Sequence, residues 1–122
     1  MNTRETIRAY FDKLQHKQGW ESFLSEDVAF TSFTSPIKTA VGRAAYLEAT
    51  KRFYSTIDSV EVQELLVDGE HACALTHYAI RPPVGAPFTS DVAEIFTVKS
   101  GKIAALAIYF DTAPFPKTPP PA

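Results

Sequence analysis

The residue that offers the clearest chemistry is Glu94, a carboxylate inside the apolar run Val92–Phe96. A charge in such a run either lies at the edge of a sheet or belongs to a functional site. If apolar side chains enclose Glu94, burial disfavours its charged form and raises its pKa, so that it can donate or accept a proton near neutral pH. Glu94 therefore indicates acid–base chemistry.

Other kinds of chemistry lack the residues that they need. The histidines, His16, His71 and His77, show no HxH or HxxxH spacing, and Cys73 is the single cysteine, so we expect no metal site. The chain has 5 glycines and no phosphate-binding loop motif. We therefore expect no nucleotide and no other cofactor.

Composition favours one soluble domain. The 122 residues are 45% hydrophobic, which is enough for one core and a modest cavity. A net charge of -2 offers no broad basic surface, so we expect neither nucleic acid nor a membrane as a partner. One cysteine cannot form an internal disulfide, and the N-terminus lacks the apolar core of a signal peptide. These features predict a cytoplasmic protein.

An amphipathic helix is predicted at the N-terminus. Asn2 and Glu5 have the spacing of a capping box. Apolar side chains follow with helical periodicity, and they are Ile7, Tyr10, Phe11 and Leu14. Tyr10 lies on this buried stripe, where its hydroxyl needs a hydrogen-bond partner.

The remaining pattern predicts further helices followed by strands. A short apolar turn at 20–24 precedes a strand at 28–34, a helix at 43–57, and strands at 59–67 and 71–81. Residues 88–111 predict a hairpin, with Ser100-Gly101 at its tip. Residues 112–122 hold five prolines and predict an extended tail outside a domain of residues 1–111. Helices gathered before an antiparallel sheet indicate an α+β fold in which a curved sheet wraps the helices.

This order of elements resembles the nuclear transport factor 2-like cone fold, and in particular its SnoaL-like branch. The motifs that carry the resemblance lie in the hairpin: Asp91–Phe96, then Gly101-Lys102-Ile103, then Tyr109-Phe110-Asp111. The resemblance covers residues 3–111 and implies a cone-shaped, mixed but mainly antiparallel sheet around the N-terminal helices.

The ketosteroid isomerases of this superfamily imply roles for three positions. Tyr10 falls at the position of a tyrosine that donates a hydrogen bond, and Glu94 falls at that of an acidic residue in the penultimate strand. The position of the aspartate base is taken by Ser32, which is a departure. Because a hydroxyl without an activating partner is not a base at neutral pH, we do not expect steroid isomerase activity.

The same comparison implies which side chains face the cavity. Matching Asp68-Gly69-Glu70 to the family's turn places Cys73, Leu75 and His77 on the cavity side, so that His77 approaches Glu94 as a proton partner, as in polyketide cyclases. The opposite sheet face, with Ile95, Ala105, Ala107 and Tyr109, is expected to form a homodimer. The residues expected to line the pocket are Leu14, Phe30, Ser32, Phe53, Leu75, Phe96, Leu106, Ile108 and Phe110.

Two functions follow from this interpretation. One is a cofactor-free enzyme of the isomerase, cyclase or dehydratase type that acts on a small, apolar, carbonyl-containing molecule, with Glu94, His77 and Tyr10 as catalytic residues. The other is a non-catalytic dimeric module that binds a hydrophobic ligand or a protein. Each residue also has a purely structural explanation, since Glu94, His77 and Tyr10 can form hydrogen bonds or ion pairs with one another or with their neighbours inside a core.

Overall fold

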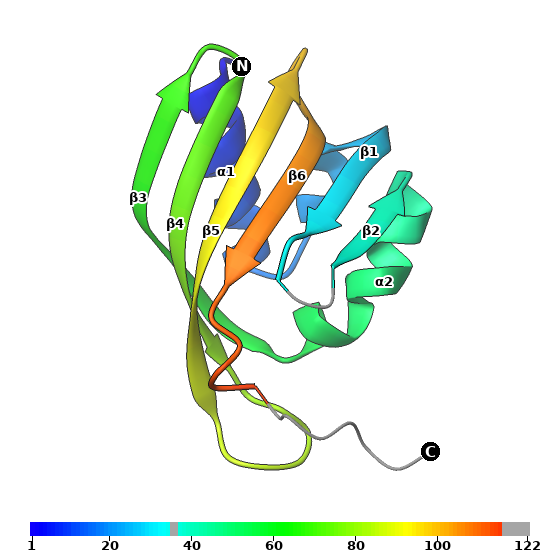
Figure 1. Ribbon diagram of the computed structural model, residues 1–122. Helices are drawn as coiled ribbons and strands as arrows, with labels where there is room; N and C mark the ends of the chain where they lie inside the picture. The colour runs from blue at the N-terminus through cyan, green and yellow to red at the C-terminus, as the bar shows by residue number, and fades with distance from the viewer. Residues whose placement is uncertain (35–36, 116–122) are drawn as a thin grey trace.

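The computed structural model describes residues 1–34 and 37–115 (Figure 1). The first half contains helix α1 (Thr3–Gln15), the 3₁₀ helix η1 (Trp20–Phe23), strands β1 (Leu24–Ser32) and β2 (Lys38–Val41), and helix α2 (Arg43–Ser55). The second half contains β3 (Ile57–Asp68), β4 (His71–Ile80), β5 (Phe88–Lys99) and β6 (Lys102–Phe110).

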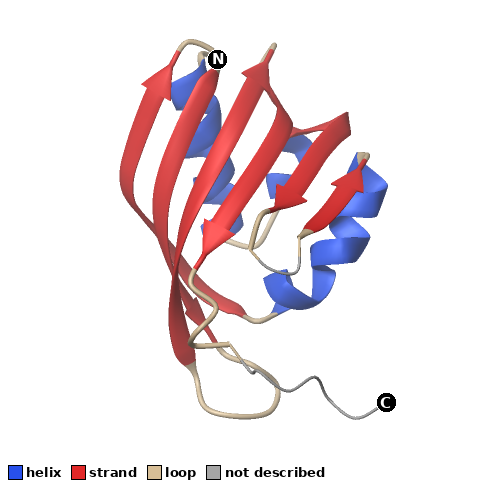
Figure 2. Cartoon of the chain, viewed as in Figure 1, coloured by secondary structure: helices blue, strands red, loops and turns tan. Residues whose placement is uncertain are grey.

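The strands form one 6-stranded sheet in the order β2-β1-β6-β5-β4-β3. Strands β1 and β6 run parallel, and the other neighbours run antiparallel. The sheet curves, and both helices lie on its inner side (Figure 2). This arrangement confirms the predicted α+β fold with a mixed sheet wrapped around helices.

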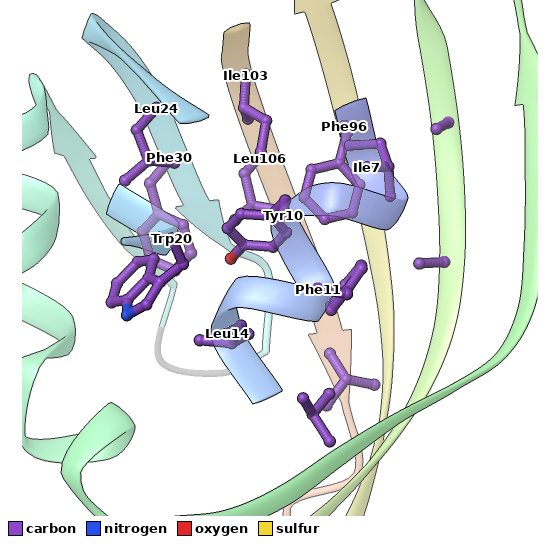
Figure 3. Close-up of a cluster of buried hydrophobic side chains, with 14 of the residues drawn as sticks. Ile7, Tyr10, Phe11, Leu14, Trp20, Leu24, Phe30, Phe96, Ile103 and Leu106 are labelled. Atoms are coloured by element: carbon purple, nitrogen blue, oxygen red, sulfur yellow. The ribbon is translucent and has the colours of Figure 1, made fainter. Parts of the chain in front are cut away.

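Helix α1 begins and packs as its sequence predicts. The Glu5 backbone N–H donates to the Asn2 side chain at 2.8 Å, and the Asn2 backbone N–H donates to the Glu5 carboxylate at 3.0 Å. These two bonds form a capping box, which satisfies orphan donors of the first turn. The apolar stripe of the helix enters the core, where the Tyr10 and Phe11 rings each lie 5.8 Å from that of Phe96 (Figure 3).

The hairpin of β5 and β6 turns where the sequence predicts. Both turn residues have positive φ, with 52° at Ser100 and 74° at Gly101. A two-residue turn of this kind matches the twist of the flanking strands, and glycine enters that region without steric cost. Lys99 and Lys102 pair on either side of it. The hairpin therefore fixes the register of β5 against β6.

Strand β2 was not predicted from the sequence. It is 4 residues long and mostly exposed, so it shows no apolar alternation. It pairs along β1 from Ser32 opposite Lys38 to Ala29 opposite Val41. Strand β1 itself begins at Leu24, earlier than predicted. Its first residues did not predict a strand because an irregularity in the pairing with β6, between Leu24 and Ala29, breaks the alternating pattern.

The chain after β6 turns beside the start of β5 and the end of β6. The Phe115 backbone N–H donates to the Thr112 carbonyl at 3.0 Å, which closes a turn. The Phe115 ring then packs against Phe88 and Phe110, at centroid distances of 5.0 and 5.2 Å. The rest of the predicted tail, residues 116–122, lies outside the described residues, and the division into domain and tail stays a prediction.

The outer sheet face carries several exposed apolar side chains, among them Leu75, Ile95 and Tyr109. Phe33 stacks on Tyr109 at 5.0 Å. The homodimer expected through this face (Ile95, Ala105, Ala107 and Tyr109) stays a prediction.

Two further observations concern residues 1–34 and 37–115. In this part of the chain, no helix combines the length and apolar character needed to cross a membrane. In the same residues, no three His, Cys, Asp or Glu side chains gather closely enough to hold a metal ion.

Candidate functional site

Glu94 points to the inner side of the sheet from the middle of β5. It lies opposite Ala74 of β4 and Ile108 of β6, and it is 2% exposed. Because side chains alternate along a strand, Val92 and Phe96 share its face, as the sequence predicts. A carboxylate is therefore held among apolar neighbours at the centre of the concave wall.

Two hydroxyl groups hold one oxygen of this carboxylate. Thr76 and Tyr78 of β4 each donate a hydrogen bond of 2.7 Å to Oε2 of Glu94. Both hydrogen bonds that the described residues donate to Glu94 end on Oε2, and none ends on the other oxygen, Oε1. Since two donors already occupy Oε2, Oε1 is the oxygen with room to take up a proton.

Burial dominates the acidity of this group. Desolvation raises the pKa of Glu94 to about 7, although the hydrogen bonds from Thr76 and Tyr78 act in the opposite direction by stabilising the carboxylate. Near neutral pH the side chain therefore exists in both forms, which is the condition for efficient proton exchange in either direction.

A cavity of about 220 Å³ lies beside Glu94, between the concave side of the sheet and helix α2. Its walls are mainly apolar, and Glu94, Tyr54 and Tyr78 contribute polar groups to them. The residues predicted from the sequence that line this cavity are Phe30, Ser32, Phe53, Leu106, Ile108 and Phe110. The arrangement can accept a small apolar molecule with a polar group directed at Glu94.

Three other residues expected at the pocket lie elsewhere. Phe96 is the next inward-facing residue of β5 after Glu94, and it is fully buried against the rings of Tyr10 and Phe11 instead of lining the cavity. Leu14 borders a separate hollow between α1 and α2. Leu75 lies on the outer face of the sheet and is 37% exposed.

The predicted inward orientation of Cys73, Leu75 and His77 is wrong. In the antiparallel pairing of β4 with β5, Glu94 lies opposite Ala74, so that the even-numbered side chains of β4 face inward. A shift of one residue exchanges the two faces of a strand, and the matched turn placed β4 one residue out of phase. Thr76 and Tyr78 therefore occupy the places assigned to Leu75 and His77.

His77 has a different partner from the one predicted. Its Nδ1 lies 2.7 Å from Oδ1 of Asp91, which is its neighbour in register on β5. Both side chains are solvent-accessible, with exposed fractions of 35% and 76%. The structure therefore does not bring His77 to Glu94, and the predicted proton exchange between them is wrong.

Tyr10 belongs to a buried group of tyrosines behind the cavity wall. The Tyr46 and Tyr54 hydroxyls form a hydrogen bond of 2.6 Å. The Tyr10 hydroxyl is fully buried and makes no hydrogen bond to a described residue. Burial raises the pKa of Tyr10 well above its usual value, and the nearby Tyr46 and Glu94 raise it further. The hydroxyls of this group therefore stay protonated.

The polar residues that actually reach the cavity were mostly missed from the sequence. Tyr54 lies on the inner side of α2 and Tyr78 on that of β4, and both line the cavity. Tyr54 belongs to the apolar side of its helix, and nothing in that pattern marks it from its neighbours. For Tyr78 the sequence did contain an indication. If Thr76 and Tyr78 face inward, His71 and His77 face solvent, and the cost of burying two imidazole groups is avoided.

Comparison with known proteins identifies related folds. A family model described as SnoaL-like domain matches residues 7–106. A candidate ketosteroid isomerase from Kribbella flavida is 24% identical over 98% of this chain and 83% of its own, with a TM-score of 0.75. A candidate SnoaL-like polyketide cyclase from Mesorhizobium loti is 20% identical over 89% of this chain and 99% of its own, with a TM-score of 0.73.

A further similar structure carries no assigned activity. It is an NTF2-like protein of unknown function from Cytophaga hutchinsonii, 16% identical over 93% of this chain and 94% of its own, with a TM-score of 0.74. A comparison with curated proteins finds no match. At these identities the solved structures support the fold, and the resemblance predicted from the hairpin motifs is confirmed.

Proposed function

This chain belongs to the family of SnoaL-like domains, and from that premise we propose that its cavity carries out cofactor-independent proton transfer. The substrate is a small apolar molecule with a carbonyl group, and the reaction is of the isomerase, cyclase or dehydratase type. The observation that carries the proposal is Glu94, whose Oε1 receives no hydrogen bond from a described residue and whose pKa is raised to about 7 by burial.

Glu94 starts the reaction as a base. In its ionised form, Oε1 removes a proton from the carbon next to the substrate carbonyl, and the electrons of that C–H bond move to the carbonyl oxygen to form an enolate. In the isomerase case the enolate is conjugated with a C=C bond of the substrate, and the neutral Glu94 then returns the proton to a different carbon of that conjugated system. Atoms and charge balance over the cycle, so that one carboxyl group suffices and the serine at position 32 need not act as a base.

Tyr54 is the group placed to stabilise the enolate oxygen. Its side chain lines the cavity, and the hydroxyl of Tyr46 lies 2.6 Å behind it. If Tyr46 donates to Tyr54, the proton of Tyr54 is free to point toward the substrate, where a hydrogen bond strengthens as negative charge develops. Tyr10 acts through this pair as a positioning residue.

Tyr78 and Thr76 position the base. Their hydrogen bonds to Oε2 fix the plane of the carboxyl group and oppose part of the effect of burial on its acidity. Without them the neutral form of Glu94 would be favoured still more strongly, and less carboxylate would be present at neutral pH.

The second candidate function is ligand binding without turnover. It is favoured by Ser32, which leaves the cavity wall without the aspartate base implied by ketosteroid isomerases. In that case Glu94 would serve only to bind a polar group of the ligand.

A ligand screen followed by turnover measurements separates the two functions. Ketones, steroids and polyketide fragments are screened by thermal shift against the protein and against Glu94→Gln, and each binder is followed for conversion by mass spectrometry and NMR. Enzymatic function predicts a product that forms with the unaltered protein and is lost in Glu94→Gln. Tight binding without any product in either protein would favour the binding module.

A further inference from the structure

A row of four paired residues crosses the cavity wall from its mouth to Glu94. Lys38 of β2 pairs with Ser32 of β1, Ser32 pairs with Ile108 of β6, and Ile108 pairs with Glu94 of β5. All four line the cavity. Residues paired directly across a sheet present their side chains on the same face, so the row forms one strip of the cavity surface.

The two ends of the row carry opposite charges. Among the described residues that line the cavity, Lys38 is the cationic side chain and Glu94 is the carboxylate. Lys38 is exposed, which places it at the mouth, whereas Glu94 is 2% exposed. Three strand spacings of about 4.8 Å separate their Cα atoms, a span of roughly 14 Å along the sheet.

Lys38 has no described partner of its own. No carboxylate in residues 1–34 and 37–115 lies within salt-bridge distance of its ammonium group. The surface between Lys38 and Glu94 is apolar on the Ile108 side and is bordered by Leu106 and Phe110. A molecule that fills this space therefore meets a cation, then the Ser32 hydroxyl, then a hydrocarbon surface, and finally an acid–base group.

We propose that the ligand is an amphipathic oxo acid, which binds Lys38 through a carboxylate at the cavity mouth and presents its carbonyl end to Glu94. This inference rests on the proposed function for the identity of the carbonyl end, and it adds the anionic end and the residue that binds it. Lys38 is a specificity residue in this arrangement, because a lysine ammonium at the end of a flexible stem can follow carboxylates at slightly different positions.

The order of groups also explains why the ligand binds in one direction. A carboxylate placed beside Glu94 would meet a second carboxyl group in a site from which water is excluded, which is unfavourable whenever Glu94 is ionised. The same carboxylate at the mouth stays partly hydrated and gains the attraction of Lys38. The charge pattern therefore orients the ligand before any chemistry takes place.

Calorimetry with a matched pair of probes tests this inference. The binding of 7-oxooctanoate is compared with that of its methyl ester, which has the same chain and ketone but no charge. We expect the acid to bind the unaltered protein roughly two- to fivefold more tightly than the ester, the size of effect measured for exposed ion pairs. The preference should weaken as salt is added, because exposed charges are screened.

Variants assign the preference to Lys38. In Lys38→Gln the acid and the ester should bind with equal affinity, while the affinity for the ester stays unchanged. In Lys38→Glu the ester should bind more tightly than the acid. Lys99→Gln removes an exposed lysine at the distant end of β5 and should keep the original preference.

The contrary results are equally definite. Equal binding of acid and ester by the unaltered protein, or an acid preference that persists in Lys38→Gln, would overturn the inference. Because calorimetry measures binding and not turnover, these results are independent of the test with Glu94→Gln. If Glu94→Gln converted the substrate as fast as the unaltered protein while the preference for the acid still depended on Lys38, the proposed function would be overturned. Lys38 would remain the anion-binding residue.

Discussion

Tyr78 donates a hydrogen bond of 2.7 Å to Oε2 of Glu94 from the neighbouring strand. Thr76 donates to the same oxygen at 2.7 Å, but its hydroxyl also lies 3.1 Å from the Val92 carbonyl. Since a hydroxyl has one proton, Thr76 can serve only one of these acceptors at a time, whereas Tyr78 serves Glu94 alone. Tyr78 is therefore the steadier support of the ionised carboxylate.

Removing that support should make Glu94 a weaker acid. In Tyr78→Phe the ring keeps its packing, but the carboxylate loses a charge-assisted hydrogen bond, so the pKa of Glu94 should rise above 7 by about one unit or more. A titration of the labelled carboxyl carbon by NMR measures this value. Tyr109→Phe, on the exposed outer face, is the matched control and should leave the pKa of Glu94 unchanged. An unshifted titration in Tyr78→Phe would contradict the assignment of this bond.

Glu94 should also make stability depend on pH. Its pKa is about 7 in the folded protein and 4.5 for an ordinary glutamate, so between these pH values the folded state binds more protons than the unfolded chain. The free energy of unfolding therefore falls as pH rises through this window, and the loss levels off above it. At one pKa unit per about 1.4 kcal/mol, the loss is on the order of 3 kcal/mol.

Urea unfolding across this pH range checks the effect. Glu94→Gln cannot ionise, so its stability relative to the unaltered protein should improve steadily from about pH 4.5 to about pH 7 and then stay constant. If the two proteins changed in parallel over the whole range, Glu94 would not carry a raised pKa.

The outer histidine offers a test of the corrected register. His77→Gln should leave ligand affinity and any turnover unchanged, because the imidazole contacts Asp91 outside the sheet and does not line the cavity. Its effect on stability should be small, within about 1 kcal/mol, as is usual for exposed ion pairs. A loss of turnover comparable to that of Glu94→Gln would show that β4 presents its other face to the cavity.

More of the fold than of the candidate site could be predicted from the sequence. The capping box at Asn2 and the turn at Ser100-Gly101 have specific local chemistry, and both elements begin and turn where predicted. The inward position of Glu94 was expected from the family resemblance, and strand alternation then placed Val92 and Phe96 on the same face, where both are buried. The capping box and the turn depend on a few neighbouring residues, which is why the sequence alone can specify them.

The apolar periodicity of β4 does not determine which of its faces points inward. Its residues alternate regularly, but Ala72 and Ala74 are no more apolar than Leu75, so periodicity alone leaves both phases acceptable. The choice is made by the pairing of Ala74 with Glu94, a contact between strands. Tyr54 was missed for a related reason, since its role depends on where α2 lies against the sheet.

Phe115 should control the size of the cavity mouth. Its ring lines the cavity and packs between Phe88 and Phe110, so Phe115→Ala should remove apolar surface from the opening and weaken the binding of apolar ligands. The ring is half-buried, and we expect a loss of about 1 kcal/mol or a little more, roughly a five- to tenfold weaker affinity. Phe33→Ala, which removes an exposed ring on the outer face, is the control and should bind as the unaltered protein does. Equal affinities for Phe115→Ala and Phe33→Ala would exclude a role for Phe115 at the mouth.

The most direct measurement of the central claim is hydrogen–deuterium exchange at the carbon next to a ketone, followed by NMR in heavy water with 7-oxooctanoate as the probe. If Glu94 is the base, the protein should accelerate exchange, and the rate should rise with pH through a midpoint near the pKa of about 7. Glu94→Gln should reduce the acceleration by roughly a hundredfold or more, the usual contribution of a general base. Equal exchange rates with the unaltered protein and with Glu94→Gln would contradict the claim that Glu94 transfers the proton.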